Sequence, residues 1–174
     1  MKIGIIVAMS KELALILPLL SESTVDCRGA VKLHCGRIGG NEVAVMQCGI
    51  GKVNAAIGAV SLIDAFAPDI VINTGVAAGA GDDVSVMDIV VADGLVHHDF
   101  WCIGEEWGQV PGSPLVFPAR VPELPEAPGV KTGLIASGEF FISKKAEVDN
   151  IRSHFPQVKA IDMESAAIAQ ACEQ

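Results

Sequence analysis

The chain has 174 residues, 51% of them hydrophobic, which is enough to fold as a single domain over residues 1–174 with its own core. Its 12 Lys and Arg against 21 Asp and Glu give a net charge of −9, which disfavours binding to nucleic acid or to an anionic membrane. The five cysteines are widely spaced and form no Cys-x-x-Cys motif, which predicts reduced thiols in a cytoplasmic protein. The apolar run at residues 3–9 is too short for a signal peptide or a membrane span.

The N-terminal segment predicts a buried strand that is followed by a helix. Residues 2–8 (KIGIIVA) are continuously apolar, as in a parallel strand that is covered on both faces. Ser10 is placed to cap the next helix, so Glu12 falls in its first turn, directly after the strand end. Two interpretations of Glu12 are open, because a first-turn Glu either complements the helix dipole at the surface or faces a ligand.

The next elements are predicted to be a hairpin and a second helix. Two β-rich runs, residues 31–38 and 42–48, are joined by the turn sequence GGN. In the following GIGKVN, Asn54 stands where a dinucleotide fingerprint has its third glycine, so a nicotinamide site is disfavoured. The glycines are interpreted as a turn that lets the backbone approach a ligand or a neighbouring chain. The helix should end before Pro68, and its apolar stripe consists of Val53, Ala56, Ile57, Val60, Ile63 and Phe66.

Further strands are predicted at residues 69–74 and 88–92. A loop of small residues, 75–81, follows the first of them and leaves room for a ligand against backbone amides. The second strand continues towards His97, His98 and Asp99. Adjacent strand residues point to opposite faces and no further ligands are suitably spaced, so neither a metal site nor a cofactor is expected.

Residues 101–128 have a different composition, with both tryptophans and six of the nine prolines, which predicts a long irregular segment that is functional or mobile. Residues 130–137 predict another strand. Phe141, just beyond it, either stacks on a planar base or belongs to the core. Residues 144–155 predict a polar surface helix with Val148 and Ile151 facing inward.

The run at residues 158–167 predicts a strand that ends at Asp162-Met163-Glu164 and continues as a helix of small residues. Glu164 is therefore expected at the carboxyl end of a strand, where α/β sheets bind ligands. Its carboxylate could accept hydrogen bonds from the vicinal hydroxyls of a ribose, or it could simply complement the helix dipole. The order of elements predicts an α/β domain with a mixed, largely parallel sheet.

Taken together, the motifs MKIGIIVAMSKE, CGIGKVNAA, DIVINTG, DIVVAD, HHD near GQVPG, SGEFFIS and IDMESAAIA resemble, in the same order, the 5′-methylthioadenosine/S-adenosylhomocysteine nucleosidases of the nucleoside phosphorylase superfamily. The resemblance implies a three-layer α/β/α fold around a central mixed sheet and a homodimer. It implies that Glu12 activates the attacking water and that Met163 and Glu164 bind the ribose. It further assigns Phe141 and Ile142 to the purine loop, Met9 and Ile50 to the 5′-substituent pocket, and Pro111 to a loop that reaches the partner's site.

The sequence departs from the family in three ways. Val76 replaces a Ser, which removes a polar contact near the ribose. The sequence VPELPEAPGV replaces a helix. The family continues beyond the position of Gln174 with a strand, whose Ser-Asp pair recognises and protonates the purine, and a final helix. The expected fold is therefore nucleoside phosphorylase-like and lacks the last strand and helix.

The implied chemistry is hydrolysis of the N-glycosidic bond of 5′-methylthioadenosine or S-adenosylhomocysteine, which releases adenine in methionine salvage. The alternatives are a purine nucleoside phosphorylase, a futalosine hydrolase, and a truncated, catalytically impaired protein that binds a purine nucleoside. A phosphorylase would need arginines around the anomeric carbon, and none of the four arginines lies in a glycine loop: Arg28, Arg37, Arg120 and Arg152.

Overall fold

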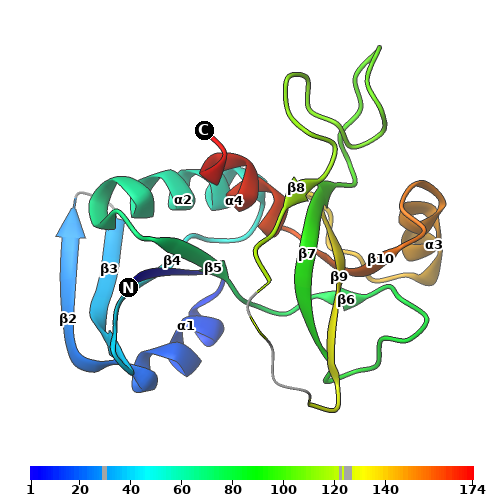
Figure 1. Ribbon diagram of the computed structural model, residues 1–174. Coiled ribbons are helices and arrows are strands. Elements are labelled where there is room, and N and C mark those ends of the chain that lie inside the picture. The colour runs from blue at the N-terminus through cyan, green and yellow to red at the C-terminus, as the bar shows by residue number, and fades with distance from the viewer. Residues whose placement is uncertain (29–30, 122, 124–126) are drawn as a thin grey trace.

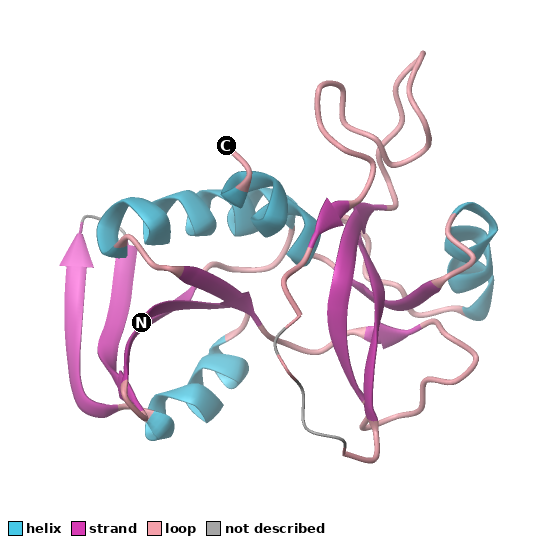
Figure 2. Ribbon diagram, viewed as in Figure 1, coloured by secondary structure: helices cyan, strands magenta, loops and turns pink. Residues whose placement is uncertain are grey.

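The computed structural model describes residues 1–28, 31–121, 123 and 127–174. Within these residues the strands form two five-stranded sheets, which lie beside one another with helices packed on them (Figures 1 and 2). The predicted α/β architecture with mixed strand pairing is confirmed, with the strands divided between two sheets. Helix α4 (Ser165–Cys172) connects the two halves, because it packs on α2 (Lys52–Phe66) and on strands β7 (Ile89–His97) and β9 (Val130–Ser137) of the second sheet.

The first sheet has the order β2-β3-β4-β1-β5, with β1 parallel to both β4 and β5 and with the predicted hairpin antiparallel. Alternate residues along each strand point to opposite faces of the sheet. Ile6 and Met46 pack towards α2, whereas Val7 and Val45 pack towards α1 and the short 3₁₀ helix η1. The elements of this half are β1 (Lys2–Val7), α1 (Ser10–Ile16), η1 (Leu17–Leu19), β2 (Ser21–Arg28), β3 (Val31–Ile38), β4 (Asn41–Gln47) and β5 (Ile70–Asn73).

The second sheet has the order β6-β10-β9-β7-β8, with the three long strands parallel and the two short edge strands antiparallel. Val96 packs on one face with Ile151 of α3, while the preceding Leu95 packs on the other face with Ala166 of α4. The elements of this half are β6 (Ala78–Gly79), β7 (Ile89–His97), β8 (Phe117–Pro118), β9 (Val130–Ser137), α3 (Lys145–His154) and β10 (Val158–Asp162).

Two local predictions are wrong. Ser10 is not the cap of helix α1, because the helix begins at Ser10 and Met9 is its N-cap. The backbone amide of Met9 donates a hydrogen bond of 2.8 Å to the Glu12 carboxylate. The apolar stripe of α2 faces the core only in part: Ala56 and Phe66 pack against it, whereas Val53 is 68% exposed and Ile57 is 62% exposed. The buried face consists of smaller side chains and one leucine: Ala55, Gly58, Ala59 and Leu62.

Close packing explains the choice of helix face. A Cβ atom at Gly58 would lie 2.6 Å from the Cβ of Cys48, so the helix backbone approaches the end of β4 too closely for a larger residue. Helix α4 also meets α2 through a small residue, Ala167.

The segment after β7 is irregular, as predicted, and extends away from both sheets before it returns as β8 (Figure 1). Residues 122 and 124–126 of the same predicted segment lie outside the described residues.

Candidate active site

The Glu12 carboxylate is fixed by backbone amides from two separate segments. Its Oε2 atom accepts hydrogen bonds from the amides of Ala8 at 3.0 Å and Met9 at 2.8 Å, where β1 turns into α1. Its Oε1 atom accepts a hydrogen bond from the amide of Val76 at 3.2 Å, in the loop after β5. The loop can come this close because Gly75 has no side chain, and a Cβ there would lie 2.7 Å from Oε1. Glu12 thus stands half-buried where β1 and β5 end.

Glu164 follows β10 and lies at the N-terminus of α4. Its Oε1 atom accepts a hydrogen bond of 2.8 Å from the amide of Gly51, which precedes α2, and only 9% of the residue is exposed. Burial raises the pKa of Glu164, and the negative charges of Asp162 and Glu12 act in the same direction. The two predicted site carboxylates, Glu12 and Glu164, are therefore near enough to influence one another.

Cys48, at the end of β4, is near the same two carboxylates. Its pKa is raised to about 11, mainly by burial and further by the charges of Glu164 and Glu12. The thiol is therefore protonated at neutral pH and does not supply a nucleophile.

A buried polar cluster holds the segment that carries Glu164. Asp162 Oδ1 accepts hydrogen bonds from the hydroxyls of Ser137 at 2.5 Å and Ser165 at 3.0 Å, and its Oδ2 binds the amide of Ser165 at 3.0 Å. Ser137 in turn accepts a hydrogen bond from the amide of Ala166 at 2.9 Å. The first turn of α4 is thus anchored to the end of β9. Sequence reasoning missed Ser137, although its position at a strand end was a usable signal.

A second polar network organises the N-terminus of α2. Glu139 accepts a hydrogen bond from the amide of Lys52 at 2.7 Å, and Asp99 pairs with the Lys52 ammonium at 2.5 Å. Asp99 also accepts a hydrogen bond of 2.8 Å from the amide of Glu139. Burial opposes ionisation of Asp99, but the Lys52 and Glu139 hydrogen bonds outweigh it, so its pKa is lowered. Asp99 and Glu139 are further residues near the site that the sequence did not single out for this purpose.

The other predicted site residues surround these networks to different degrees. Ile50 is 52% exposed beside Gly51, and Phe141 is 81% exposed. Ile142 packs against the core of the second sheet. Met163 lies between Asp162 and Glu164, and Met9 is the N-cap of α1. Pro111 lies in the irregular segment that extends away from both sheets.

His97 and His98 are buried near this region, and His97 Nε2 contacts Gln170 Oε1 at 3.0 Å. No group of three or more His, Cys, Asp or Glu side chains in the described part of the chain could hold a metal ion. Among the same residues, no helix is both long enough and apolar enough to cross a membrane.

Polar side chains from the ends of β1, β7, β9 and β10 therefore meet at one end of an α/β fold. This position is where proteins of the α/β class bind small ligands. The chain matches the family model of the Phosphorylase superfamily over residues 2–174 and belongs to this family.

Known relatives and solved structures agree with this assignment. The chain is 42% identical over 180 residues to a 5′-methylthioadenosine/S-adenosylhomocysteine nucleosidase from Desulfotalea psychrophila, covering 98% of this chain and 77% of the relative. The nucleosidase of Neisseria meningitidis, solved with methylthio-immucillin-A, superposes with a TM-score of 0.93 at 36% identity, covering 99% of this chain and 80% of that one.

Two further structures bear on the ligand. The nucleosidase of Colwellia psychrerythraea, solved with adenine, has a TM-score of 0.93 at 38% identity and covers 100% of this chain and 77% of that one. A futalosine hydrolase mutant of Helicobacter pylori is less similar, with a TM-score of 0.86 at 29% identity, and covers 99% of this chain and 83% of that one. The fold is therefore that of the nucleoside phosphorylases, as expected.

Proposed function

We propose that this protein hydrolyses the N-glycosidic bond of 5′-methylthioadenosine and S-adenosylhomocysteine and releases adenine. The observation that carries the proposal is that backbone amides hold the Glu12 and Glu164 carboxylates where strands end, in a chain 42% identical to a nucleosidase of this specificity. In this reaction water forms a bond to the anomeric carbon while the bond from that carbon to the purine nitrogen breaks. The sugar develops positive charge in the transition state, and the leaving purine takes a proton.

Glu12 is proposed as the base that takes the proton from the attacking water. Three amide hydrogen bonds orient its carboxylate without neutralising it. Such preorganisation means that little rearrangement is needed when the water loses its proton.

Glu164 is proposed to accept hydrogen bonds from the ribose hydroxyls, next to Met163. The Gly51 amide uses one of its oxygens, and a carboxylate has further lone pairs available. Because the residue is buried, hydrogen bonds to its charge are stronger than they would be in water.

The remaining assignments concern the rest of the substrate. Phe141 and Ile142 are proposed to contact the purine, and Met9 and Ile50 the 5′-thioether. Apolar side chains at the 5′ position favour an alkylthio group over a phosphate. The family resemblance assigns the proton donor for the purine to a Ser-Asp pair that follows the position of Gln174.

We also propose that the protein is a cytoplasmic homodimer. Three large apolar side chains of α2 are substantially exposed in the single chain, Val53 at 68%, Ile57 at 62% and Val60 at 49%. Trp101 and Ile103 of the irregular segment are exposed as well. Exposed large apolar side chains of this kind are typical of a protein interface, and such an interface would let Pro111 reach the partner's site.

The competing functions are less well supported. Two arginines that a phosphorylase could use for phosphate are engaged elsewhere, since Arg37 donates to the carbonyl of Gly40 and Arg152 pairs with Asp82. The futalosine hydrolase of Helicobacter pylori is less similar to this chain than the nucleosidase of Neisseria meningitidis is, by both identity and TM-score. A protein that binds nucleoside without turnover remains the non-enzymatic alternative.

Calorimetric titration with 5′-methylthioadenosine, with and without phosphate, tests the proposal. We expect binding that is independent of phosphate, together with release of adenine. Binding that requires phosphate would favour the phosphorylase, and binding without any adenine release would favour the non-enzymatic protein.

A further inference from the structure

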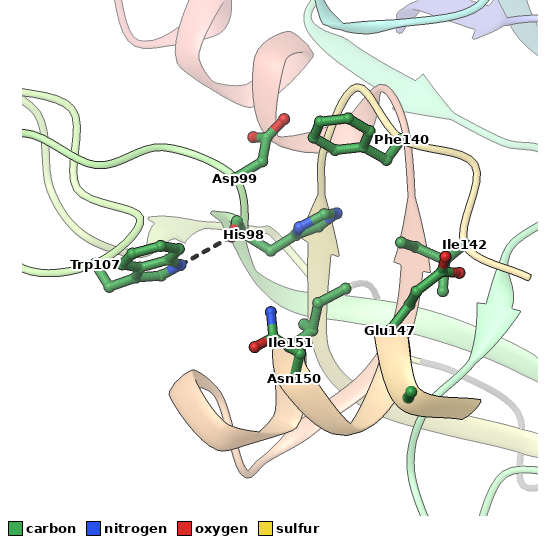
Figure 3. A pocket seen from close by; sticks show the side chains of 9 residues that line it. His98, Asp99, Trp107, Phe140, Ile142, Glu147, Asn150 and Ile151 are labelled. Carbon is green, nitrogen blue, oxygen red and sulfur yellow. Dashed lines mark hydrogen bonds between the residues drawn. The ribbon is translucent and has the colours of Figure 1, made fainter. Parts of the chain in front are cut away.

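The segment that carries the proposed purine contacts leaves the second sheet directly after β9. Beyond the strands the ladder continues for one bond, since the amide of His98 donates to the carbonyl of Ser137 at 2.9 Å. A further parallel bond would join the amide of Glu139 to the carbonyl of His98. That carbonyl instead accepts the indole N–H of Trp107 at 2.9 Å, as the dashed line in Figure 3 shows. The Glu139 amide therefore needs another acceptor.

The carboxylate of Asp99, just beyond the end of β7, is that acceptor. Its Oδ2 atom binds the amide of Glu139 at 2.8 Å, while its Oδ1 atom pairs with the Lys52 ammonium at 2.5 Å. Both charged side chains are largely buried, Asp99 at 10% and Lys52 at 18% exposure. Asp99 and Phe140 both line a cavity of about 510 Å³ between β7, α3 and the segment after β9 (Figure 3). A hydrogen bond to a buried, paired carboxylate is stronger than one to a neutral carbonyl, so this end of the segment is firmly held.

The segment is fixed at its other end by a second carboxylate. Glu147 Oε2 binds the amides of Ser143 at 2.9 Å and Lys144 at 3.0 Å, at the start of α3. Only residues 140–142 lie between the two fixed ends, and two of them are the proposed purine contacts. A loop held at both ends has few conformations to lose when a ligand binds, so its position is largely set before binding.

Lys52 connects this segment to the ribose side of the site. Its backbone amide donates to the Glu139 carboxylate at 2.7 Å and its ammonium pairs with Asp99, so the three residues form a closed ring. The preceding amide, that of Gly51, donates to Glu164, the proposed acceptor for the ribose hydroxyls. Adjacent amides at the N-terminus of α2 therefore bind both the segment with the purine contacts and the ribose acceptor. One helix end thus fixes the spacing between them.

We propose that Asp99 is a positioning residue for purine recognition, which holds Phe141 and Ile142 at the correct distance from Glu164. It acts through the backbone amide of Glu139, since each of its oxygens already has a protein donor. The inference rests on the function proposed above and adds a residue to it.

Asp99→Asn tests this role, and Asp88→Asn is its matched control. Asp99 uses a different oxygen for each partner, so an amide can keep at most one of the two bonds. Asp88 stands just before β7, as Asp99 stands just after it, and likewise binds one amide, that of Ser85 at 2.8 Å, and one ammonium, that of Lys131 at 3.8 Å. The control thus removes the same kind of bond pair at the opposite end of the same strand.

Two ligands separate a role in purine recognition from a general loss of structure. Asp99→Asn should bind adenine roughly tenfold more weakly than the wild type in calorimetry. It should bind 5-methylthioribose, which has no purine, with unchanged affinity. Asp88→Asn should bind both ligands as the wild type does. Equal adenine affinity in Asp99→Asn and the wild type, or equal losses for both ligands, would overturn the inference, whereas a wild type that binds neither ligand would overturn the proposed function itself.

Amide exchange in the ligand-free protein tests the anchor separately from the function. The Glu139 amide should exchange about tenfold faster or more in Asp99→Asn, and at the wild-type rate in Asp88→Asn. The Ser143 amide, which Glu147 binds, should be unchanged in both. An unchanged rate at Glu139 in Asp99→Asn would contradict the anchor, whatever the ligands do.

Lys52→Met is a second variant that keeps the inference testable if Asp99→Asn does not fold. It removes the ammonium from the ring and leaves the Glu139 amide its acceptor. We expect a smaller loss of adenine affinity, about threefold, and again no change for 5-methylthioribose. Adenine affinity equal to that of the wild type would count against the ring as the device that positions the purine contacts.

Discussion

The Glu164 carboxylate accepts a hydrogen bond of 2.8 Å from the amide of Gly51, although 113 positions separate the two residues in the sequence. The bond joins the N-terminus of α4, after β10, to the N-terminus of α2, after β4. The amides at the start of a helix carry partial positive charge, which offsets part of the cost of burying the Glu164 carboxylate. The same carboxylate is proposed to bind the ribose, so its position depends on the docking of α4 against α2.

Replacement of Glu164 by Gln should weaken 5′-methylthioadenosine binding roughly 10- to 100-fold, because hydrogen bonds to a charged acceptor are stronger than those to an amide. The Gln oxygen can still accept from Gly51, so the fold should be retained. Glu139→Gln is the matched control, since Glu139 accepts from the next amide, Lys52 at 2.7 Å, and has no proposed contact with ribose. Calorimetry measures both affinities. Equal losses in the two variants would refute the assigned role of Glu164.

A polypeptide of residues 1–174 should release adenine from 5′-methylthioadenosine more slowly than a full-length relative, by about 10²- to 10⁴-fold, because it lacks the general acid that the family resemblance implies. Glu12→Gln should then reduce the rate little further. Adenine release by both polypeptides is the measurement. Turnover equal to that of the relative would mean that another residue protonates the purine.

The substitution Gly58→Ala should destabilise the protein by about 1–3 kcal/mol, because the new methyl group meets the Cβ of Cys48 in a packed interface. This loss exceeds the gain in helix propensity, which is at most about 1 kcal/mol. Gly40→Ala is a control, since nothing lies within 4 Å of a Cβ there. Urea unfolding measures both changes, and an unchanged or increased stability for Gly58→Ala would contradict the packing argument.

The substitution Ile57→Glu should convert the proposed homodimer to a monomer, because it buries a charge in the middle of the exposed apolar stripe of α2. Val86→Glu adds the same charge at a loop residue that is 94% exposed, and should leave the assembly unchanged. Light scattering distinguishes the outcomes. A wild-type protein that is already monomeric at micromolar concentration would remove the homodimer proposal.

The contribution of His97 to the stability of the protein should fall as the pH decreases below about 6.5, the ordinary pKa of histidine. Burial lowers the pKa of His97 in the folded state, partly opposed by Gln170, so the unfolded chain binds the proton more tightly. The stabilisation is therefore complete above the unfolded pKa and is lost as the pH falls through the folded pKa. His97→Phe should show a smaller pH slope of the unfolding free energy. Any constant cost of leaving Gln170 unpaired would not alter that slope, and identical slopes would contradict the prediction.

Much of the fold could be predicted from local patterns. Runs rich in apolar residues identified β1, β5, β7, β9 and β10, because a strand covered on both faces is built mainly from apolar residues. Gly-Gly-Asn identified the hairpin, because few residues adopt its turn conformation. Strand ends also predicted where Glu12 and Glu164 would lie, since ligands bind at the carboxyl ends of parallel strands.

The sequence by itself therefore determined the order of the strands and helices other than β2, β6 and β8, and the positions of the candidate site carboxylates along the chain, because both depend on side-chain periodicity and on neighbouring residues. Only the tertiary structure decided which face of α2 is buried, since the close approach of Gly58 to Cys48 involves a distant strand. It also decided that Glu12 binds Val76, that Asp99 joins Lys52 to Glu139, and that a cavity lies beside His98. These contacts join residues far apart in the chain, and no local pattern encodes a distance between them.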